Sequence, residues 1–316
     1  MTEIEVMRNS HLIDPELHFW GWEIPVYLFL GGVTAGVMIL SGLLAMRGDL
    51  RERSKWTRWM PFAGPVLISV GMLALFLDLE FKTHVYRFYL AFEWTSPMSW
   101  GAWILVAIYP AAVLLGFAEL DRREVDALVR WFPVRRLHLG GLTRWLHRLA
   151  RGRGATLGRV NVGLGIALGG YTGVLLGTLG ARAAWSSIML GPLFLVSGLS
   201  TGAALMMLFP LEEKEHHFIR RWDVGAIGFE LAFLALFFMG LFTSGGQDGR
   251  EAIALFFGGK YTVPFWTLVV FGGLLVPLAM EMLESRKHLR PSLLAPSLVL
   301  IGGLTLRWVV VLAGQA

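Results

Sequence analysis

Few polar side chains interrupt the long apolar stretches of this sequence, and those that do are candidates for chemistry. Asp78 ends one stretch, Glu23 begins another, and Glu230 and Arg307 lie within two more. Because a charge inside a membrane is costly, such residues are by default candidates for proton transfer or ligand binding. A carboxyl group can accept or release a proton, so this set predicts acid–base chemistry. For Glu230 and Arg307, an internal ion pair is the structural alternative.

Tyr171 is the polar exception in a glycine-rich apolar segment, where its hydroxyl needs a partner. That hydroxyl could donate to the carbonyl of a bound ligand or contact a neighbouring helix instead. Asp78 also has a structural explanation, because Lys82 and Arg87 follow it and could neutralise a carboxylate at a helix end. The sequence leaves these alternatives open.

The elements that must position these residues are membrane helices. Hydrophobic residues make up 55% of the chain and charged residues 16%, and the mean hydropathy is +0.59. Stretches of about 20 apolar residues, long enough to cross a ~30 Å hydrocarbon core, recur throughout. A membrane β-barrel would instead show alternating segments of about ten residues. We predict an all-α integral membrane protein with eight transmembrane helices, at residues 24–46, 60–80, 98–119, 160–180, 186–209, 224–243, 263–283 and 292–314.

The basic residues between these spans predict which side of the membrane each loop faces. Four loops hold 21 of the 28 Lys and Arg residues, and they are 47–59, 120–159, 210–223 and 284–291. Since basic loops stay in the cytoplasm, both termini are predicted on the outer, periplasmic side of the cytoplasmic (inner) membrane. The net charge of +5 then follows from topology and gives no reason to expect nucleic acid. Glu119 and Glu281 fall at cytoplasmic ends of spans, where we expect water to reach them.

The longest loop, 120–159, divides the sequence into two sets of four spans. We predict two four-helix bundles, residues 1–180 including this loop and residues 181–316. Within the loop, residues 142–151 place apolar side chains on one helical face and arginines on another, which predicts a helix lying on anionic membrane lipid. Glycines at positions 165, 169, 173 and 177 predict a face for close packing of a neighbouring helix.

The sequence contains no cysteine, and none of its eight histidines lies in the middle of a predicted span. It therefore lacks the thiolates that hold an iron–sulfur cluster and the histidines that would hold a haem between membrane helices. We predict no metal site, no haem and no cluster in this chain. Any such centre would belong to a partner, while this protein could still bind a redox-active organic molecule.

Six segments, in order over nearly the whole chain, resemble the NrfD/PsrC family of membrane subunits from polysulfide reductase-type and nitrite reductase-type respiratory complexes. They are FWGWEIPVYLFLGGVTAG (19–36), SPMSWGAWIL (96–105), YTGVLLG (171–177), PLFLVSGLSTGAAL (192–205), FGGKYTVPFW (257–266) and LRWVVVLAGQ (306–315).

The resemblance implies that the protein binds menaquinone or ubiquinone near the outer face of its first four helices. Carried over residue by residue, the quinone pocket would use Trp22, Glu23, Asp78 and Tyr171, with Asp78 and Glu23 handling protons. Electrons would pass to a ferredoxin-like iron–sulfur subunit on the outer face, itself linked to a molybdopterin subunit or a multihaem cytochrome. The expected activity is quinol/quinone oxidoreduction within that complex.

Three further hypotheses accompany this one. Glu230 and Arg307 could form a proton path between the cytoplasm and the quinone. Eight spans with intramembrane charge also fit a secondary transporter, although the two halves show no matching broken helices. A redox-inactive membrane anchor is the third possibility, against which Glu23, Asp78 and Tyr171 together argue.

Overall fold

The computed structural model describes residues 20–47, 53–90, 92–178, 184–243, 247–287 and 291–315, which hold helices and connecting turns and no strand. Residues 1–19, which include the N-terminus predicted on the periplasmic side, lie outside this description. Eight long helical segments confirm the eight predicted spans. They are α1 (Glu23–Met46), α2–η1–α3 (Lys55–Trp59, Met60–Phe62 and Ala63–Asp78), α5 (Pro97–Glu119), α9 (Gly154–Gly177), α10 (Leu190–Met207), α11 (Glu213–Thr243), α13–η3–α14 (Thr262–Pro264, Phe265–Leu275 and Val276–Lys287) and α15 (Leu294–Ala313).

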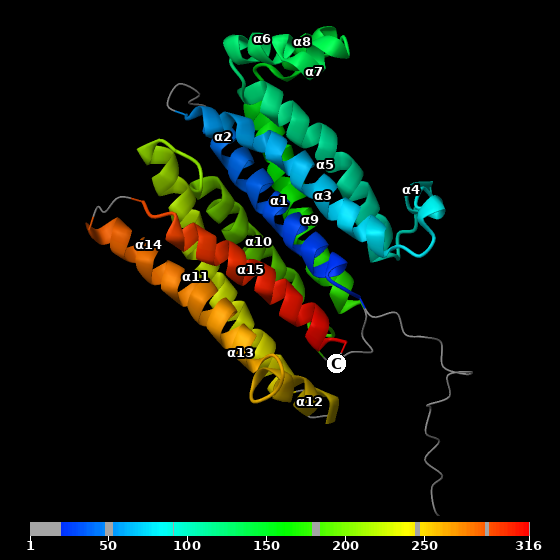
Figure 1. The fold of residues 1–316 in the computed structure, drawn as a ribbon, viewed down its shortest axis with the longest axis vertical. Helices are drawn as coiled ribbons and strands as arrows, with labels where there is room; N and C mark the ends of the chain where they lie inside the picture. Colours follow the sequence, from blue (N-terminus) through cyan, green and yellow to red (C-terminus); the bar gives the residue numbers. More distant parts are fainter. Residues whose placement is uncertain are drawn as a thin grey trace, which may run out of the picture.

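Short helices occupy the connections. Beyond α3 lie η2 (Lys82–His84) and α4 (Arg87–Leu90), and α12 (Gln247–Phe256) follows α11. The loop after α5 forms α6 (Arg122–Arg130), α7 (Phe132–Arg136) and α8 (Gly140–Ala150). The long helices run side by side, and α6 to α8 form a separate layer across one end (Figure 1). We call this the basic end, where α1 ends and α11 begins, and we call the other the opposite end.

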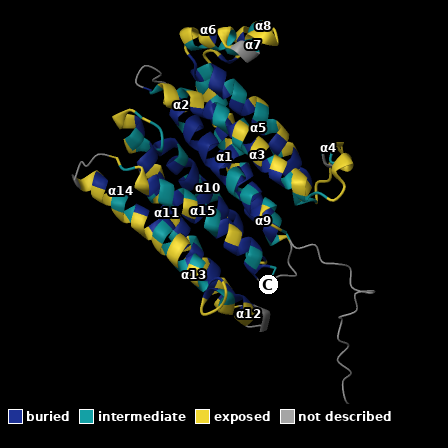
Figure 2. Cartoon of the chain, in the orientation of Figure 1, coloured by how far each residue is buried: buried dark blue, intermediate teal, exposed yellow. Residues whose placement is uncertain are grey.

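Helix α1 lies at the centre of the molecule, because it packs against α3, α9, α10 and α15. Glycine makes the closest of these contacts possible. A methyl group on Gly36 would overlap the carbonyl oxygen of Gly198, and one on Gly202 would lie 2.5 Å from the Gly36 Cα. The buried faces of α1 and α10 are consequently the darkest in Figure 2, whereas α3, α5 and α14 expose large apolar surfaces.

The glycine face predicted in α9 is confirmed at three of its four positions. A methyl group would lie 2.8 Å from the Ala35 carbonyl oxygen at Gly165 and 2.7 Å from a Leu195 methyl carbon at Gly169, and it would overlap Leu190 at Gly173. At Gly177 the nearest atoms are 3.8 Å away, which is ordinary contact.

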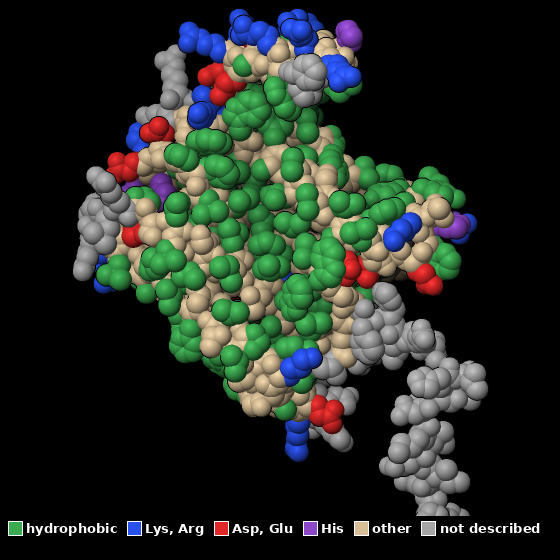
Figure 3. Space-filling model, in the orientation of Figure 1, with side chains coloured by type: hydrophobic (Ala, Val, Ile, Leu, Met, Phe, Trp, Pro, Cys, Tyr) green, Lys and Arg blue, Asp and Glu red, His purple; other side chains and the backbone are tan. Residues whose placement is uncertain are grey.

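The layer of α6 to α8 is joined to the long helices by charged side chains. Arg58 in α2 contacts Asp121 at 3.1 Å and Glu124 at 3.0 Å, the two residues that cap the start of α6. Glu119 corrects the sequence prediction, because it is only 4% exposed and forms an ion pair with the buried Arg53 instead of facing water. Lys and Arg side chains gather over this layer, while apolar side chains cover the middle of the visible face (Figure 3).

The opposite end joins the two extremes of the described sequence. Trp20 stacks on Trp185 with 5.2 Å between ring centroids. The Trp20 backbone N–H donates to Gln315 Oε1 at 2.7 Å, and Gln315 Nε2 donates back to the Trp20 carbonyl at 3.2 Å. Trp185 Nε1 donates to the Val310 carbonyl at 2.9 Å. The first and last described residues therefore hold the end of α15 against the start of α1.

Candidate functional site

Three of the predicted site residues lie at the opposite end of packed helices. Glu23 is the first residue of α1 and Asp78 the last of α3, which stops there because Leu79 takes an extended conformation. Tyr171 lies in the last two turns of α9. It is nearer the end of its helix than the predicted span 160–180 implies, because α9 runs from Gly154 to Gly177. Helices α3 and α9 both pack on α1, so the three residues share one end of the bundle.

The side chain of Tyr171 on α9 packs against α5, where it occupies the space that Gly101 leaves by having no side chain. Its ring is 9% exposed, and a methyl group on Gly101 of α5 would overlap the phenol oxygen and the carbon that bears it. Gly101 belongs to the SPMSWGAWIL segment, so this glycine and this tyrosine form one structural unit. The hydroxyl is thereby placed in the first turns of α5.

Tyr27 is a candidate that the sequence analysis missed. It lies one turn after Glu23 on α1, is 3% exposed, and has Tyr171 and Tyr89 as neighbours. A tyrosine near the end of a membrane helix is typically an interfacial anchor, so its type alone carries no signal. Its four-residue spacing from Glu23 is the feature that could have revealed it, since residues at that spacing share a helix face.

A cavity of about 520 Å³ begins immediately beyond Asp78. Its wall runs from Leu79 to Ser99, two residues before Gly101, and includes His84 and Arg87. This volume is within the range of roughly 300–1,000 Å³ that small-molecule sites occupy. The cavity therefore lies between the end of α3, which carries Asp78, and the start of α5, against which Tyr171 packs.

Two residues at this end differ in how they relate to the cavity. Trp22 precedes α1 and is 47% exposed, so it lies at the surface, unlike the buried Tyr27 and Tyr171. Tyr89 is a neighbour of Tyr27 and lies in α4, outside the membrane spans. Burial, with the neighbouring Tyr109, raises the pKa of the Tyr89 hydroxyl above its ordinary value.

Glu230 and Arg307 both contact Ser197 in the interior of the second half of the sequence. Arg307 is completely buried, and its Nη1 donates to Ser197 Oγ at 2.6 Å and to the Gly303 carbonyl at 2.9 Å. Glu230 is 2% exposed, hydrogen-bonds Ser197 and interacts electrostatically with Arg307. The hydroxyl of Ser197 thus connects a buried acid with a buried base contributed by two other helices.

The polar contacts continue from Glu230 towards the basic end. Ser200 Oγ donates to Asp223 Oδ1 at 2.5 Å, and the Asp223 carboxyl faces that of Glu281 on α14. Apart from each other, Glu281 and Asp223 Oδ2 have no hydrogen-bond partner in the described part of the protein. Glu281 also corrects a prediction, because it is 2% exposed and does not face water.

Arg220 and His217 complete this series at the basic end. Arg220 is 5% exposed, interacts with Glu281, and donates from Nη2 to His217 Nδ1 at 2.7 Å. His217 is exposed. We call the series from His217 through Asp223, Glu281 and Glu230 to Arg307 the polar series.

The polar series reaches the first half of the protein at two consecutive glycines of α1. A methyl group on Gly32 would lie 2.9 Å from Arg307 Nη2, so the guanidinium approaches the α1 backbone directly. The neighbouring Gly31 faces the methyl group of Thr172, which follows Tyr171. Arg307 and Thr172 therefore contact consecutive positions of α1, which are about 100° apart around the helix. No cluster of three or more potential metal-binding side chains occurs among the described residues.

Comparison with known proteins places these features in context. The family model described as "Polysulphide reductase, NrfD" matches residues 12–316. Protein NrfD of Escherichia coli (strain K12) is 31% identical, over 100% of this chain and 99% of that protein. The NrfD homolog of Haemophilus influenzae is 28% identical and the C subunit of polysulfide reductase from Wolinella succinogenes 27%, each over 94% of this sequence and 94% of the relative.

Proposed function

The protein belongs to the NrfD polysulphide reductase family, and from this we propose that it is the quinone-binding membrane subunit of a respiratory oxidoreductase complex. Its eight long apolar helices and its family make it a multi-pass membrane protein. The relative from Wolinella succinogenes is named as one component of a polysulfide reductase, which supports a role as one subunit among several.

The observation that carries the proposal is the arrangement around the cavity at the opposite end. A quinone head group needs apolar walls for its ring and hydrogen-bonding groups for its two oxygens. Phe81 and Met98 supply apolar wall, Asp78 directly precedes the lining residue Leu79, and Tyr171 packs on Gly101, two residues after the lining residue Ser99. These groups fit menaquinone or ubiquinone.

The side chains would have separate roles in quinol oxidation. A bound quinol supplies two electrons and two protons on oxidation. The Asp78 carboxylate would accept a proton from one quinol hydroxyl, while the Tyr171 hydroxyl would orient the opposite oxygen. Glu23 would pass protons between this end and water. Trp22, exposed at the surface, would contact the tail or the edge of the ring.

The electrons would leave through a partner. The sequence has no cysteine to hold an iron–sulfur cluster, so a ferredoxin-like subunit docked over α4 at the opposite end is the proposed acceptor or donor. That subunit would connect to a molybdopterin enzyme or a multihaem cytochrome. The charge asymmetry of the loops supports an opposite end on the periplasmic side of the inner membrane. Residues 1–180 and 181–316 are proposed as the two four-helix bundles.

We further propose that the polar series conducts protons between the cytoplasm and the quinone site. Two buried carboxyl groups side by side, such as Asp223 and Glu281, are best satisfied when they share one proton. Such a pair can release and regain a proton without leaving two buried charges together. Ser197 and Ser200 would relay it along α10 to Glu230 and Arg307.

Purification and a single substitution test the quinone site. Extraction in mild detergent is expected to recover the protein with an iron–sulfur subunit and with quinone. Asp78→Asn is expected to lower quinol-dependent turnover by roughly 10²–10⁴, the usual range for loss of a positioned general base, with the complex still assembled. Asp126→Asn, an exposed acid on α6, is the matched control and should retain full turnover.

Two results would contradict the quinone proposal. One is recovery of a lone polypeptide without quinone or iron–sulfur partner. The other is equal turnover in Asp78→Asn and the wild type. Either result would leave a membrane anchor or a transporter as the better description.

The proton path has its own test. In proteoliposomes containing the whole complex, Glu230→Gln is expected to reduce proton movement across the membrane per quinol oxidised, because the amide cannot carry a proton. Quinol oxidation measured without a membrane potential should fall less. The same substitution at Glu251, which lies on α12 outside the spans, is the control. Unchanged proton movement in Glu230→Gln would show that the polar series is structural.

A further inference from the structure

A groove between α10 and α11 is separate from both the cavity at Asp78 and the buried carboxyl groups of the polar series. Its volume is about 860 Å³, and it opens at the basic end beside Arg47, the residue that ends α1. We call it the α10–α11 groove. Apart from His217, which also belongs to the polar series, its lining residues play no part in the proposed quinone chemistry.

Positive charge gathers at one end of the groove. Arg47, Lys214 and Arg221 line it there, and Glu213 alone is acidic among its described lining residues. The Arg47 guanidinium stacks on Phe218 at 4.1 Å from the ring centroid, which fixes it at the groove's edge. Guanidinium groups bind phosphate oxygens with paired N–H donors, so this end is suited to a phosphate.

His217 adds a neutral donor to the same end. Arg220 Nη2 lies 2.7 Å from His217 Nδ1, and a guanidinium can only donate, so Nδ1 is the acceptor. The proton of the neutral ring is therefore on Nε2. His217 also lines the groove, where its Nε2–H can donate to an anionic oxygen.

The groove becomes apolar as it runs into the membrane. Lys214 and Phe229 both line it and are 15 residues apart on α11, which corresponds to about 22 Å along the helix. Towards Phe229, the walls are Val196 and Leu199 of α10 and Ala226 of α11. Gly225 has no atom within 4 Å of where a methyl group would be, so it leaves the groove open midway.

The length of α11 places the charged end at the membrane surface. Its 31 residues extend about 46 Å, which exceeds the ~30 Å hydrocarbon core by about ten residues. The first turns, with Lys214, His217 and Arg221, therefore reach the depth of lipid head groups. The segment from Gly225 to Phe229 lies at the depth of acyl chains.

We propose that the α10–α11 groove binds one anionic glycerophospholipid, with its phosphate on Arg47, Lys214 and Arg221 and an acyl chain beside Gly225. Basic pockets between membrane helices at the cytoplasmic surface hold anionic head groups in this way. Three cations against the single acid Glu213 among the described lining residues favour an anionic head group over a neutral one. The proposal is independent of the proposed function and does not rest on the quinone site.

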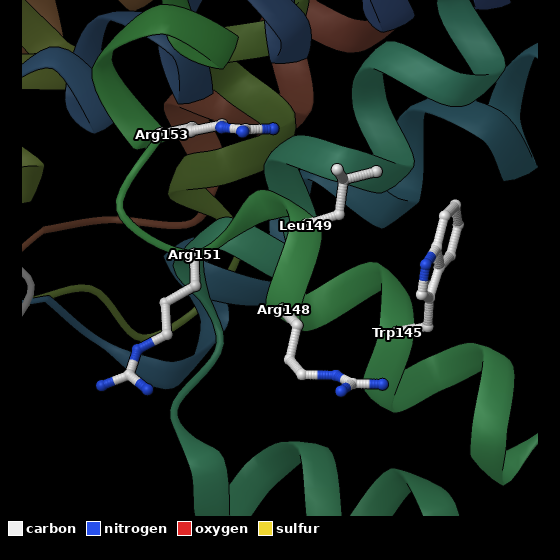
Figure 4. Close-up of a pocket in the computed structure, with 5 residues that line it drawn as sticks. All are labelled: Trp145, Arg148, Leu149, Arg151 and Arg153. Atoms are coloured by element: carbon white, nitrogen blue, oxygen red, sulfur yellow. The ribbon is translucent and has the colours of Figure 1, made fainter.

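A second basic hollow provides a comparison. It has a volume of about 360 Å³ and lies on α8 and the turn after it. Figure 4 shows that the guanidinium groups of Arg148, Arg151 and Arg153 point in different directions there. This hollow has no long apolar groove beneath it, so it serves as a control for general attraction of anionic lipid to positive charge.

The test compares lipids that differ only in the head group. Delipidated whole complex in detergent is titrated with dioleoylphosphatidylglycerol, dioleoylphosphatidylcholine or inorganic phosphate, and bound lipid is counted by native mass spectrometry. We expect one tightly held phosphatidylglycerol, a clear preference over phosphatidylcholine, and no competition by millimolar phosphate. Equal retention of the two lipids, or displacement by phosphate, would overturn the proposal with the wild-type protein alone.

Matched variants locate the site. Combined substitution Arg47→Gln and Arg221→Gln should weaken phosphatidylglycerol binding roughly ten- to thirtyfold, from the usual contribution of a cation near an anionic lipid surface. Gly225→Leu should block the acyl chain and abolish retention of the tight lipid. The controls are Arg148→Gln with Arg151→Gln, and Gly228→Leu, whose glycine is also open but does not line the groove. Equal losses in the controls and the groove variants would place the lipid elsewhere.

Discussion

The contact between Tyr171 and Gly101 shows how one residue without a side chain can position a functional one. The phenol ring occupies the space where a Cβ on Gly101 would be, so neither residue can change without affecting the other. The hydroxyl gains a fixed place at the start of α5, beside the cavity that follows Asp78. Tyr27, buried one turn into α1, is a neighbour of Tyr171.

Substitutions of this pair separate the hydroxyl from the ring. Tyr171→Phe keeps the packing and removes one hydrogen bond, so quinol-dependent turnover is expected to fall about fivefold, equivalent to about 1 kcal/mol. Gly101→Ala displaces the whole ring and should cost more. Gly163→Ala on α9, where no atom lies within 4 Å, is the control. Full turnover in Gly101→Ala would show that this contact does not position the quinone site.

At the scale of helices, glycine decides which elements approach closely. In a membrane, both the lipid and the protein interior are apolar, so helices gain little from burying apolar side chains against one another. Close backbone contact through small residues takes over that role. The pairs Gly36 with Gly198 and Gly42 with Gly158 bring α1 against α10 and α9.

A methyl group at the α1–α10 contact should loosen the whole molecule. Gly36→Ala is expected to destabilise the protein by about 1–3 kcal/mol, because the methyl group would meet backbone atoms that cannot move independently. Gly228→Ala, on the open side of α11, should be neutral or slightly stabilising. Thermal unfolding of both variants in the same detergent provides the measurement. Equal midpoints would show that α1 and α10 can separate without cost.

At the scale of the whole molecule, charge is distributed along the axis of the helices. Lys and Arg gather over α6 to α8, and the middle of the visible surface is apolar (Figure 3). The polar series runs from the basic end inwards, while the proposed quinone cavity opens at the opposite end. The sidedness of the protein therefore determines which compartment exchanges protons with each site.

The absence of native cysteine makes this sidedness measurable. Thr95 is exposed at the opposite end and Ser285 at the basic end, so each can be replaced by cysteine as a label site. We expect an impermeant maleimide added to cells with a permeabilised outer membrane to label Thr95→Cys only. Ser285→Cys should react after the inner membrane is opened. The reverse pattern would invert the proposed topology.

Hydropathy and motif order were enough to predict the eight spans and the family, because both are properties of long segments. They could not show which face of each helix points inwards, since an apolar residue suits lipid and core equally. That is why Glu281 and Glu119 were expected to meet water, and why Tyr27 was missed. Only the packing of α1, α10, α11 and α14 decides that Asp223 meets Glu281, that Arg307 reaches Gly32, and that Tyr171 rests on Gly101.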